Sequence, residues 1–379
     1  MTEKLYYKDA YIKDFTATVT ECTEERGAYL IALDRTAFFP NEAGQSADGG
    51  TLSGVRVLDA FERGGIIYHK TEAPLGVGTA VKGEIDFPER FRKMQSHTAE
   101  HLLSGIIHTR HGFDNVGFHL GEDMVTFDAS GKLEREDIAE IERLANLAIY
   151  ENRRVSAYFP TASELENMEY RSKLELRQDV RIVSIDGYDD CACCAPHVGT
   201  LGEIGIIKIL SFEMHRGGTR IYMLAGSDAY SDTVKKYEAL RKISGMLSAP
   251  PEKTPEALSV FLAELENERY KNRALEERYV GLITATVPEE GNAVLYHPEL
   301  SPEGLRALAD SVATRISGIA VALGGEENNY KYVIASRGAD LGKAAKEINS
   351  ALEGRGGGRG EMIQGSFYTS LDRIKKYFK

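Results

Sequence analysis

The stretch SHTAEHLL, residues 96–103, decides how the rest of this sequence is interpreted. It lies in a segment that starts with Pro88 and ends near Gly112, in which apolar residues recur at helical spacing. His97 and His101 are four positions apart, so on a helix both rings project from one face and can reach the same ion. Such a pair alone is more often two packed or hydrogen-bonded histidines than a metal site.

A second pair of candidate ligands lies in CACCAPH, residues 191–197, where Cys193 and His197 are again four positions apart. Imidazole nitrogens and a thiolate are ligands that zinc prefers, and two such pairs are a much stronger signal than one. The sequence therefore predicts a zinc site formed by His97, His101, Cys193 and His197. Cys191 and Cys194 could compete as a Cys-x-x-Cys pair, but a redox role would need a βαβ context that the pattern does not indicate.

Length and composition limit the classes of protein that fit. The 379 residues imply two or three domains, and 58 acidic against 46 basic residues give a net charge of −12. This balance argues against a protein that coats nucleic acid non-specifically, because phosphate contacts come from Lys and Arg. No stretch is apolar and long enough to span a membrane, and the charged N-terminus lacks a signal sequence, so we expect a cytoplasmic protein.

The apolar patterns predict an α+β fold in four parts. Residues 1–87 read as a small β-barrel, and residues 88–231 as a two-layer α/β domain that holds the zinc site. Residues 232–282 are expected to form a helical linker or short coiled coil, and residues 283–379 a C-terminal α/β domain. Further helices are expected near 134–151, 162–176, 301–315 and 341–352, and a glycine-rich loop after the last of these.

The motifs resemble a known family. His97-Thr-Ala-Glu-His101 and Cys193-Cys-Ala-Pro-His197 are similar to the HxxxH and CxxxH metal motifs of the alanyl-tRNA synthetase editing domain and of its free-standing relatives, the AlaX proteins. The stretch Thr36 to Gln45 is similar to that family's TxFYPxxGGQ loop. The last domain, with Arg355-Gly-Gly-Gly358 and Met362-Ile-Gln364-Gly365, resembles the C-terminal, DHH-associated domain of alanyl-tRNA synthetase. The resemblance spans nearly the whole chain and implies a long-form AlaX protein.

The chain departs from that family at two places. Ala43 stands where the family has the first glycine of GGQ, which leaves Gln45 in place but changes the loop before it. The C-terminal motif continues as Gln364-Gly-Ser-Phe, without the family's run of glycines.

The resemblance implies a trans-editing hydrolase that removes serine or glycine from mischarged alanine tRNA, with zinc as its metal. Thr36 and Gln45 are then the candidates for recognising the substrate. The tRNA is expected to contact the C-terminal residues Arg355, Gly356, Gly357, Gly358, Arg359 and Gln364, in a segment where six basic and three acidic residues from 350 to 379 give a local charge of +3. Dimerisation through the linker and C-terminal domain is also expected.

Two other functions remain open at this point. One is a tRNA-binding protein whose zinc is structural and which has no deacylase activity; the other is a metallohydrolase acting on a small ester or amide. Near the histidines, Arg90, Arg92 and Lys93 read either as a second RNA-contact strip or as a solvated face. Glu100 is expected to point away from the metal as a solvated charge, and His119 reads as an ordinary strand residue.

Overall fold

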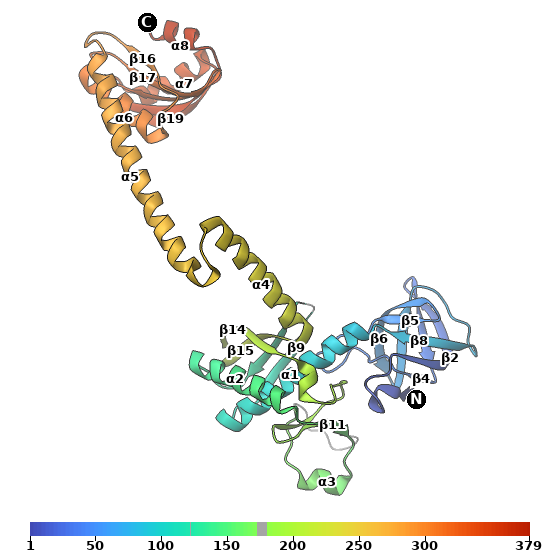
Figure 1. Cartoon of the computed structure of the whole chain (residues 1–379). Coiled ribbons are helices and arrows are strands. Elements are labelled where there is room, and N and C mark those ends of the chain that lie inside the picture. The colour runs from blue at the N-terminus through green and yellow to red at the C-terminus, as the bar shows by residue number, and fades with distance from the viewer. Residues whose placement is uncertain (122, 173–179) are drawn as a thin grey trace. The chain divides into compact units, whose positions relative to one another are not determined.

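The computed structural model describes residues 1–121, 123–172 and 180–379. The chain divides into two compact units, Met1–Ala239 and Leu240–Lys379 (Figure 1). Both contain helices and sheets, which confirms the mixed α and β class. No helix in the described ranges is long and apolar enough to cross a membrane. The finer division into four domains stays a prediction.

The N-terminal part of the first unit is a closed barrel. Its strands pair in the order β2 (Asp14–Glu25), β3 (Ala28–Leu33), β7 (Ile66–Thr71), β6 (Val55–Arg63), β5 (Gly50–Leu52) and β8 (Ala80–Ile85), and β8 pairs back to β2. Alternate residues point inward, so Ala17 and Val19 of β2 lie in the barrel core. Two short strands, β1 (Glu3–Lys4) and β4 (Arg35–Thr36), pair beside it, next to the 3-10 turn Leu5–Tyr7.

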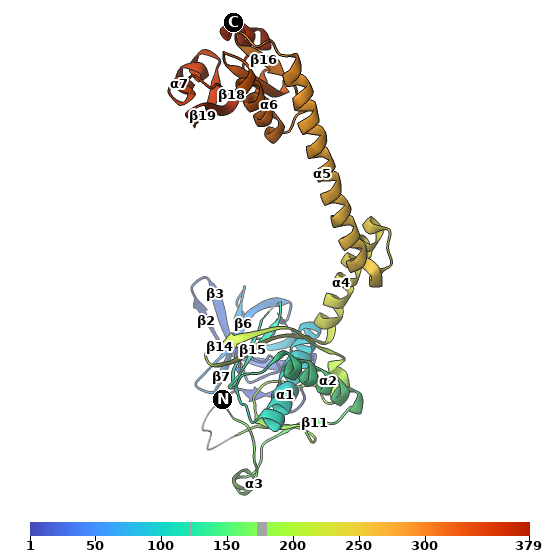
Figure 2. The ribbon, with the colours of Figure 1, turned by 90° about the vertical axis from the view of Figure 1, so that its left-hand side faces the viewer.

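Helix α1 (Phe87–His111) follows the barrel and confirms the helix expected around the histidines. Asp86 caps its first turn by accepting a hydrogen bond from the Glu89 amide, and Gly112 ends it in the left-handed conformation, at φ 69°. Nearly all of the middle of α1 is buried, in a layer formed with α2 (Arg135–Glu151) and an antiparallel sheet. Figure 2 shows α1 and α2 side by side.

That sheet has the order β14 (Ile207–His215), β15 (Gly218–Ala225), β10 (Val125–Ala129) and β9 (Asn115–Leu120). A second, three-stranded sheet is formed by β11 (Val155–Tyr158), β12 (Ile182–Ile185) and β13 (Asp189–Ala192), and the CACC cluster begins at the end of β13. A 3-10 turn, Leu201–Ile204, leads from the cluster into β14. The two histidines and the cysteine cluster therefore lie on elements that pack together.

The helix expected at 162–176 is shorter than predicted. Helix α3 covers only Ala162–Asn167, and residues 168–172 are not helical, so the prediction is wrong there; 173–176 lie outside the described residues. Thr161 and Glu164 form a capping box at its start, but α3 buries no side chain, so nothing in the described chain extends it by packing.

The basic residues before the histidines are not an RNA strip or a solvated face, and both of those readings are wrong. Arg90 and Lys93 are buried, and their side chains bind the barrel: Arg90 pairs with Asp48, and Lys93 donates to the carbonyl of Ala47 over 2.7 Å. Arg92 forms ion pairs with Glu89 and Asp228. These cations therefore attach α1 to its neighbours.

The second unit is built on a five-stranded sheet with helices on both faces. The strand order is β16 (Ala293–Tyr296), β17 (Ala320–Glu326), β18 (Asn329–Ala335), β20 (Met362–Phe367) and β19 (Gly354–Arg359). One face packs against α5 (Thr254–Thr286) and α6 (Pro302–Arg315), and the other against α7 (Leu341–Ala351) and α8 (Leu371–Tyr377). Helix α4 (Gly226–Leu247) joins the two units, and the 3-10 turn Pro251–Lys253 precedes α5.

The glycine-rich segment is a strand and not the predicted loop. β19 is an edge strand that pairs antiparallel with β20, placing Gly356 opposite Gly365. A Cβ on Gly365 would lie 2.2 Å from the carbonyl oxygen of Arg355 and 2.8 Å from the hydroxyl of Tyr332. Glycine is therefore required because the two backbones and the tyrosine approach too closely for a side chain.

Replacing Gly365 with alanine should destabilise the second unit by about 1–3 kcal/mol, because the added methyl group overpacks the β19–β20 contact. Gly357→Ala is the matched control: its Cβ would have no atom within 4 Å, so it should leave the stability unchanged or slightly raised. The denaturant midpoint of the full chain measures both. Equal midpoints for the two variants would contradict this account of the glycines.

Candidate metal centre

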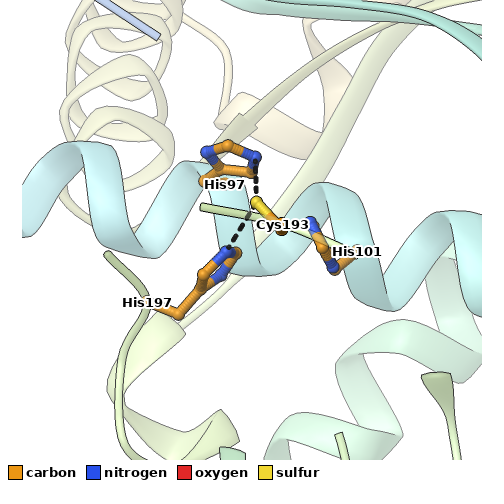
Figure 3. Close-up of side chains that lie close together, drawn as sticks. All are labelled: His97, His101, Cys193 and His197. Carbon is orange, nitrogen blue, oxygen red and sulfur yellow. Dashed lines mark hydrogen bonds between the residues drawn. The ribbon is translucent and has the colours of Figure 1, made fainter. Parts of the chain in front are cut away.

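Four side chains from two elements meet at one point. His97 and His101 come from α1, and Cys193 and His197 come from the segment after β13 (Figure 3). One ligand atom from each lies within 4.8 Å of all the others, and Cys193 Sγ is 3.6 Å from His97 Nε2 and 3.5 Å from His197 Nε2. The three histidines are buried. The structure thus brings together all four residues that the sequence proposed.

Gln45 determines which nitrogen of His97 can bind a metal. Its side-chain oxygen Oε1 lies 3.0 Å from His97 Nδ1. Because an amide oxygen only accepts, Nδ1 carries the hydrogen and Nε2 keeps its lone pair. Nε2 is the atom that faces Cys193.

Thr98 does the same for His197. Its hydroxyl donates to the carbonyl of Met94 over 2.7 Å, which uses its only hydrogen. The same oxygen lies 3.0 Å from His197 Nδ1 and must accept from it. His197 therefore also directs a bare Nε2 at Cys193.

Asp189 lies beside the third histidine. One of its carboxylate oxygens lies 3.4 Å from His101 Nδ1, the loosest of the three contacts, and Arg171 holds both oxygens at 2.6 and 2.7 Å. Burial opposes the ionised form of Asp189, but the adjacent His101 ring and the hydrogen bonds from Arg171 outweigh it and lower the pKa of this carboxyl. His101 Nδ1 forms no hydrogen bond with the described residues, so the nearby carboxylate favours a hydrogen on this nitrogen only through its charge.

This donor set fits a metal ion. Three imidazoles whose N–H groups are directed outward and one thiol inward are the combination that tetrahedral sites use. Burial raises the pKa of the Cys193 thiol and lowers the pKa of His197 well below its usual value, so both side chains are neutral without a cation. A bound divalent ion would stabilise the thiolate. His101, Asp189 and Cys191 form a second close group, but Asp189 is already occupied by Arg171.

A cavity of about 870 Å³ opens beside the cluster. His97, His101 and Cys193 line it together with the loop Glu42–Gly44, Asn115, Phe118, Arg171 and Arg181. Arg181 fixes the cysteine segment by donating to the carbonyls of Cys193 and Ala195, both over 2.9 Å. The metal position therefore lies in the wall of a space that could hold a small molecule.

Glu100 is a residue that the sequence reasoning missed, and the expectation of a solvated charge facing away is wrong. It is 3% exposed and lines the same cavity as His97 and His101. Its place three residues after His97 was the available signal, because residues at i and i+3 share a helix face.

The two residues proposed to recognise the substrate are not lining residues of this cavity. Thr36 is fully buried at the barrel, where its hydroxyl lies 2.8 Å from His69 Nε2 and accepts from the Phe38 amide. Burial lowers the pKa of His69 to about 4, so this histidine is neutral. Gln45 contacts the centre through its hydrogen bond with His97. Direct recognition of a substrate by either residue stays a prediction, and His119 is an exposed strand residue.

The proposed RNA-contact residues lie in the second unit. Arg355 and Gly356 to Gly358 line an open groove of about 590 Å³ between β19 and α7, with Lys346 on the opposite wall. Arg359 lies at the end of β19 outside the groove, and Gln364 accepts a hydrogen bond from Arg306 over 2.6 Å. Lys346 was not anticipated, because only the fold brings α7 beside the glycine strand.

Comparisons with known proteins match two parts of the chain. Residues 180–222, which include Cys193 and His197, match the threonyl and alanyl tRNA synthetase second additional domain, and residues 283–379 match the DHHA1 domain. The alanine–tRNA ligase of Ignicoccus hospitalis is 31% identical over 378 residues, which cover 95% of this chain and 40% of that protein. The alanine–tRNA ligase of Pyrococcus furiosus is 31% identical over 386 residues, covering 96% and 42%.

This chain is a homologue of alanyl-tRNA synthetases. The resemblance inferred from the motifs is confirmed, and the two matched domains are consistent with an AlaX-like protein that has a C-terminal domain. The chain spans about two fifths of the length of these curated relatives. Among solved structures, the C-Ala domain of Aquifex aeolicus alanyl-tRNA synthetase is 24% identical; the match covers 23% of this chain and 86% of that domain, with a TM-score of 0.20.

Thr98→Val should weaken metal binding by about 10- to 100-fold, because it removes the oxygen that orients His197 while keeping the size of the side chain. Thr98→Ser, which keeps the hydroxyl, should bind nearly as the parent does. Competition with a chromophoric chelator, using Zn²⁺ as the probe, measures both affinities. A valine variant with the affinity of the parent would show that Thr98 does not act on the metal.

Proposed function

We propose that this chain is a zinc-dependent aminoacyl-tRNA deacylase that hydrolyses serine or glycine from mischarged alanine tRNA. The observation that carries the proposal is the position of the metal-ligand cluster, of which His97, His101 and Cys193 line the cavity and His197 is the fourth member. The homology to alanine–tRNA ligases supplies the class of substrate.

The chemistry of alanine selection explains why such a hydrolase is needed. A pocket that accepts alanine cannot strongly reject glycine, which lacks one methyl group, or serine, which adds one hydroxyl. A second site that hydrolyses the wrong ester is the solution when binding alone cannot discriminate. The cavity beside the cluster has the volume of a site for a small molecule such as the aminoacylated end of a tRNA.

Some residues of the site would bind the metal, and others orient the residues that bind it. His97, His101, Cys193 and His197 would bind zinc. Gln45 and Thr98 keep the imidazoles of His97 and His197 in the coordinating tautomer, and the Asp189 carboxylate lies beside His101. When bound, zinc can polarise an ester carbonyl and lower the pKa of a water molecule. Phe118, against the ring of His97 at 4.6 Å, supplies an apolar wall.

A tRNA-binding protein with a structural zinc is the second candidate. It is favoured by the number of donors, because four protein ligands at one ion are typical of closed structural sites, whereas catalytic sites keep one position open. Both candidate functions predict that the protein binds tRNA, but only the deacylase predicts hydrolysis of the aminoacyl ester.

The groove of the second unit is where we propose that tRNA is held. Arg355, Arg359 and Lys346 form no ion pair with any described residue, so their charges are available to phosphates. The three glycines between the arginines let an RNA backbone approach β19 closely. The homodimer through the linker and C-terminal domain stays a prediction.

The metal-loaded protein should deacylate seryl- or glycyl-tRNA of the alanine acceptor and leave alanyl-tRNA largely intact. His97→Ala should lower the rate at least about 100-fold, because it removes a ligand, and treatment with a chelator should do the same. His119→Ala, an exposed histidine on β9, is the matched control and should keep full activity. Tight tRNA binding without turnover by metal-replete protein would favour the second candidate.

The double substitution Arg355→Ala and Arg359→Ala should weaken tRNA binding for all sequences alike and should lower the magnitude of the slope of log K against log salt by about 1–2. Arg143→Ala, an arginine paired with Glu140 on α2, is the control with an expected unchanged slope. Filter binding at several salt concentrations measures both. An unchanged slope in the double variant would remove Arg355, which lines the groove, and the neighbouring Arg359 from the RNA interface.

A further inference from the structure

The face of helix α1 that meets the cavity carries other polar side chains besides the two metal ligands. Residues 97, 100, 101 and 104 follow the i, i+3, i+4, i+7 spacing of one helix face. Glu100 is therefore held in the cavity wall on the same helix face as the two histidines, and it is 3% exposed. It is not one of the four clustered ligands, so its carboxylate is left for another partner.

The hydrogen bonds of Glu100 leave one of its oxygens open. Ser104 Oγ and Asn115 Nδ2 both donate to Oε1. Oε2 accepts no hydrogen bond from the described residues, and it is not among their fully buried atoms without a partner. Because Glu100 lines the cavity, Oε2 is the atom that a molecule bound there would meet.

The charged residues that line the cavity indicate what kind of molecule would bind there. Among the described lining residues the cations are Arg171, which binds both oxygens of Asp189, and Arg181, which donates to two backbone carbonyls. Glu100 forms no ion pair in the part of the chain that the structure describes. Arg171 is close enough to interact electrostatically with Glu100, but it is paired with Asp189. A buried carboxylate whose cationic neighbour is already paired would be stabilised by a ligand with a positive group.

We propose that Glu100 binds the α-ammonium group of the aminoacyl ester, which makes this residue a determinant of specificity for substrates with a free amino group. The proposal rests on the proposed function, because an aminoacyl ester carries its ammonium group one carbon away from the carbonyl that must approach the metal ligands. Oε2 would accept a charge-assisted hydrogen bond from that group. Ser104 and Asn115 position the carboxylate through Oε1.

The test compares each aminoacyl ester with an analogue in which a hydroxyl replaces the amino group, a change of charge with almost no change of size. The parent, loaded with zinc, should hydrolyse the amino form of seryl-tRNA with a kcat/KM about 10- to 100-fold higher than that of the hydroxy form. Glu100→Gln should lose most of this preference, mainly through KM, and should hydrolyse the hydroxy form as the parent does. Its zinc content and thermal midpoint should match those of the parent.

Glu42→Gln is the matched control, because Glu42 lines the same cavity but is exposed; it should keep the preference. A preference that survives in Glu100→Gln, or that is lost equally in Glu42→Gln, would overturn the proposal. Binding of 3′-amide analogues of seryl-adenosine, with and without the amino group, is measured on the parent by calorimetry. Equal affinities of the two analogues would overturn the proposal for Glu100, whether or not Glu100→Gln folds. Because this measurement needs no turnover, it separates failure of the proposal from absence of deacylase activity.

Discussion

The ion pair between Arg90 and Asp48 is the constraint on which the metal centre depends. Arg90 is fully buried on α1, and besides Asp48 its guanidinium binds the carbonyls of Ala10 and Ala37 at 3.1 and 2.6 Å. Asp48 also accepts from the amide of Phe39. The helix with the histidines is thus attached to the loop that carries Gln45. Removing one partner of such a buried pair typically costs about 3–5 kcal/mol.

The centre is assembled from segments that are distant in sequence, and each contributes one orienting atom. The barrel loop supplies Gln45 for His97, α1 supplies Thr98 for His197, and β13 supplies Asp189 for His101. Since the hydrogen bonds of Gln45 and Thr98 exist in the protein chain itself, the imidazoles of His97 and His197 are held in the coordinating tautomer by the fold. A metal ion then needs little rearrangement of its ligands, which is the physical meaning of a preorganised site.

The metal ligands could be predicted from the sequence because their arrangement follows from local spacing. His97 with His101, and Cys193 with His197, are four residues apart, so both pairs could be found before the fold was known. Glu100 was missed although the i, i+3 rule placed it on the same face. Long-range contacts such as Arg90 with Asp48 have no local signal, and the glycines of β19 read as a turn because their requirement arises only from the partner strand.

The contact between β19 and β20 also determines how this chain can change in evolution. Gly356 and Gly365 face each other across the pair, so a side chain on one cannot be compensated by a change on the other, because the other can become no smaller. These positions are fixed by the fold whatever the groove binds. Arg355 and Arg359, on either side of the three glycines of β19, are exposed and are free to vary with the ligand. In a family of such sequences, variation at the arginines would therefore follow the change of partner, while the glycines would stay the same through it.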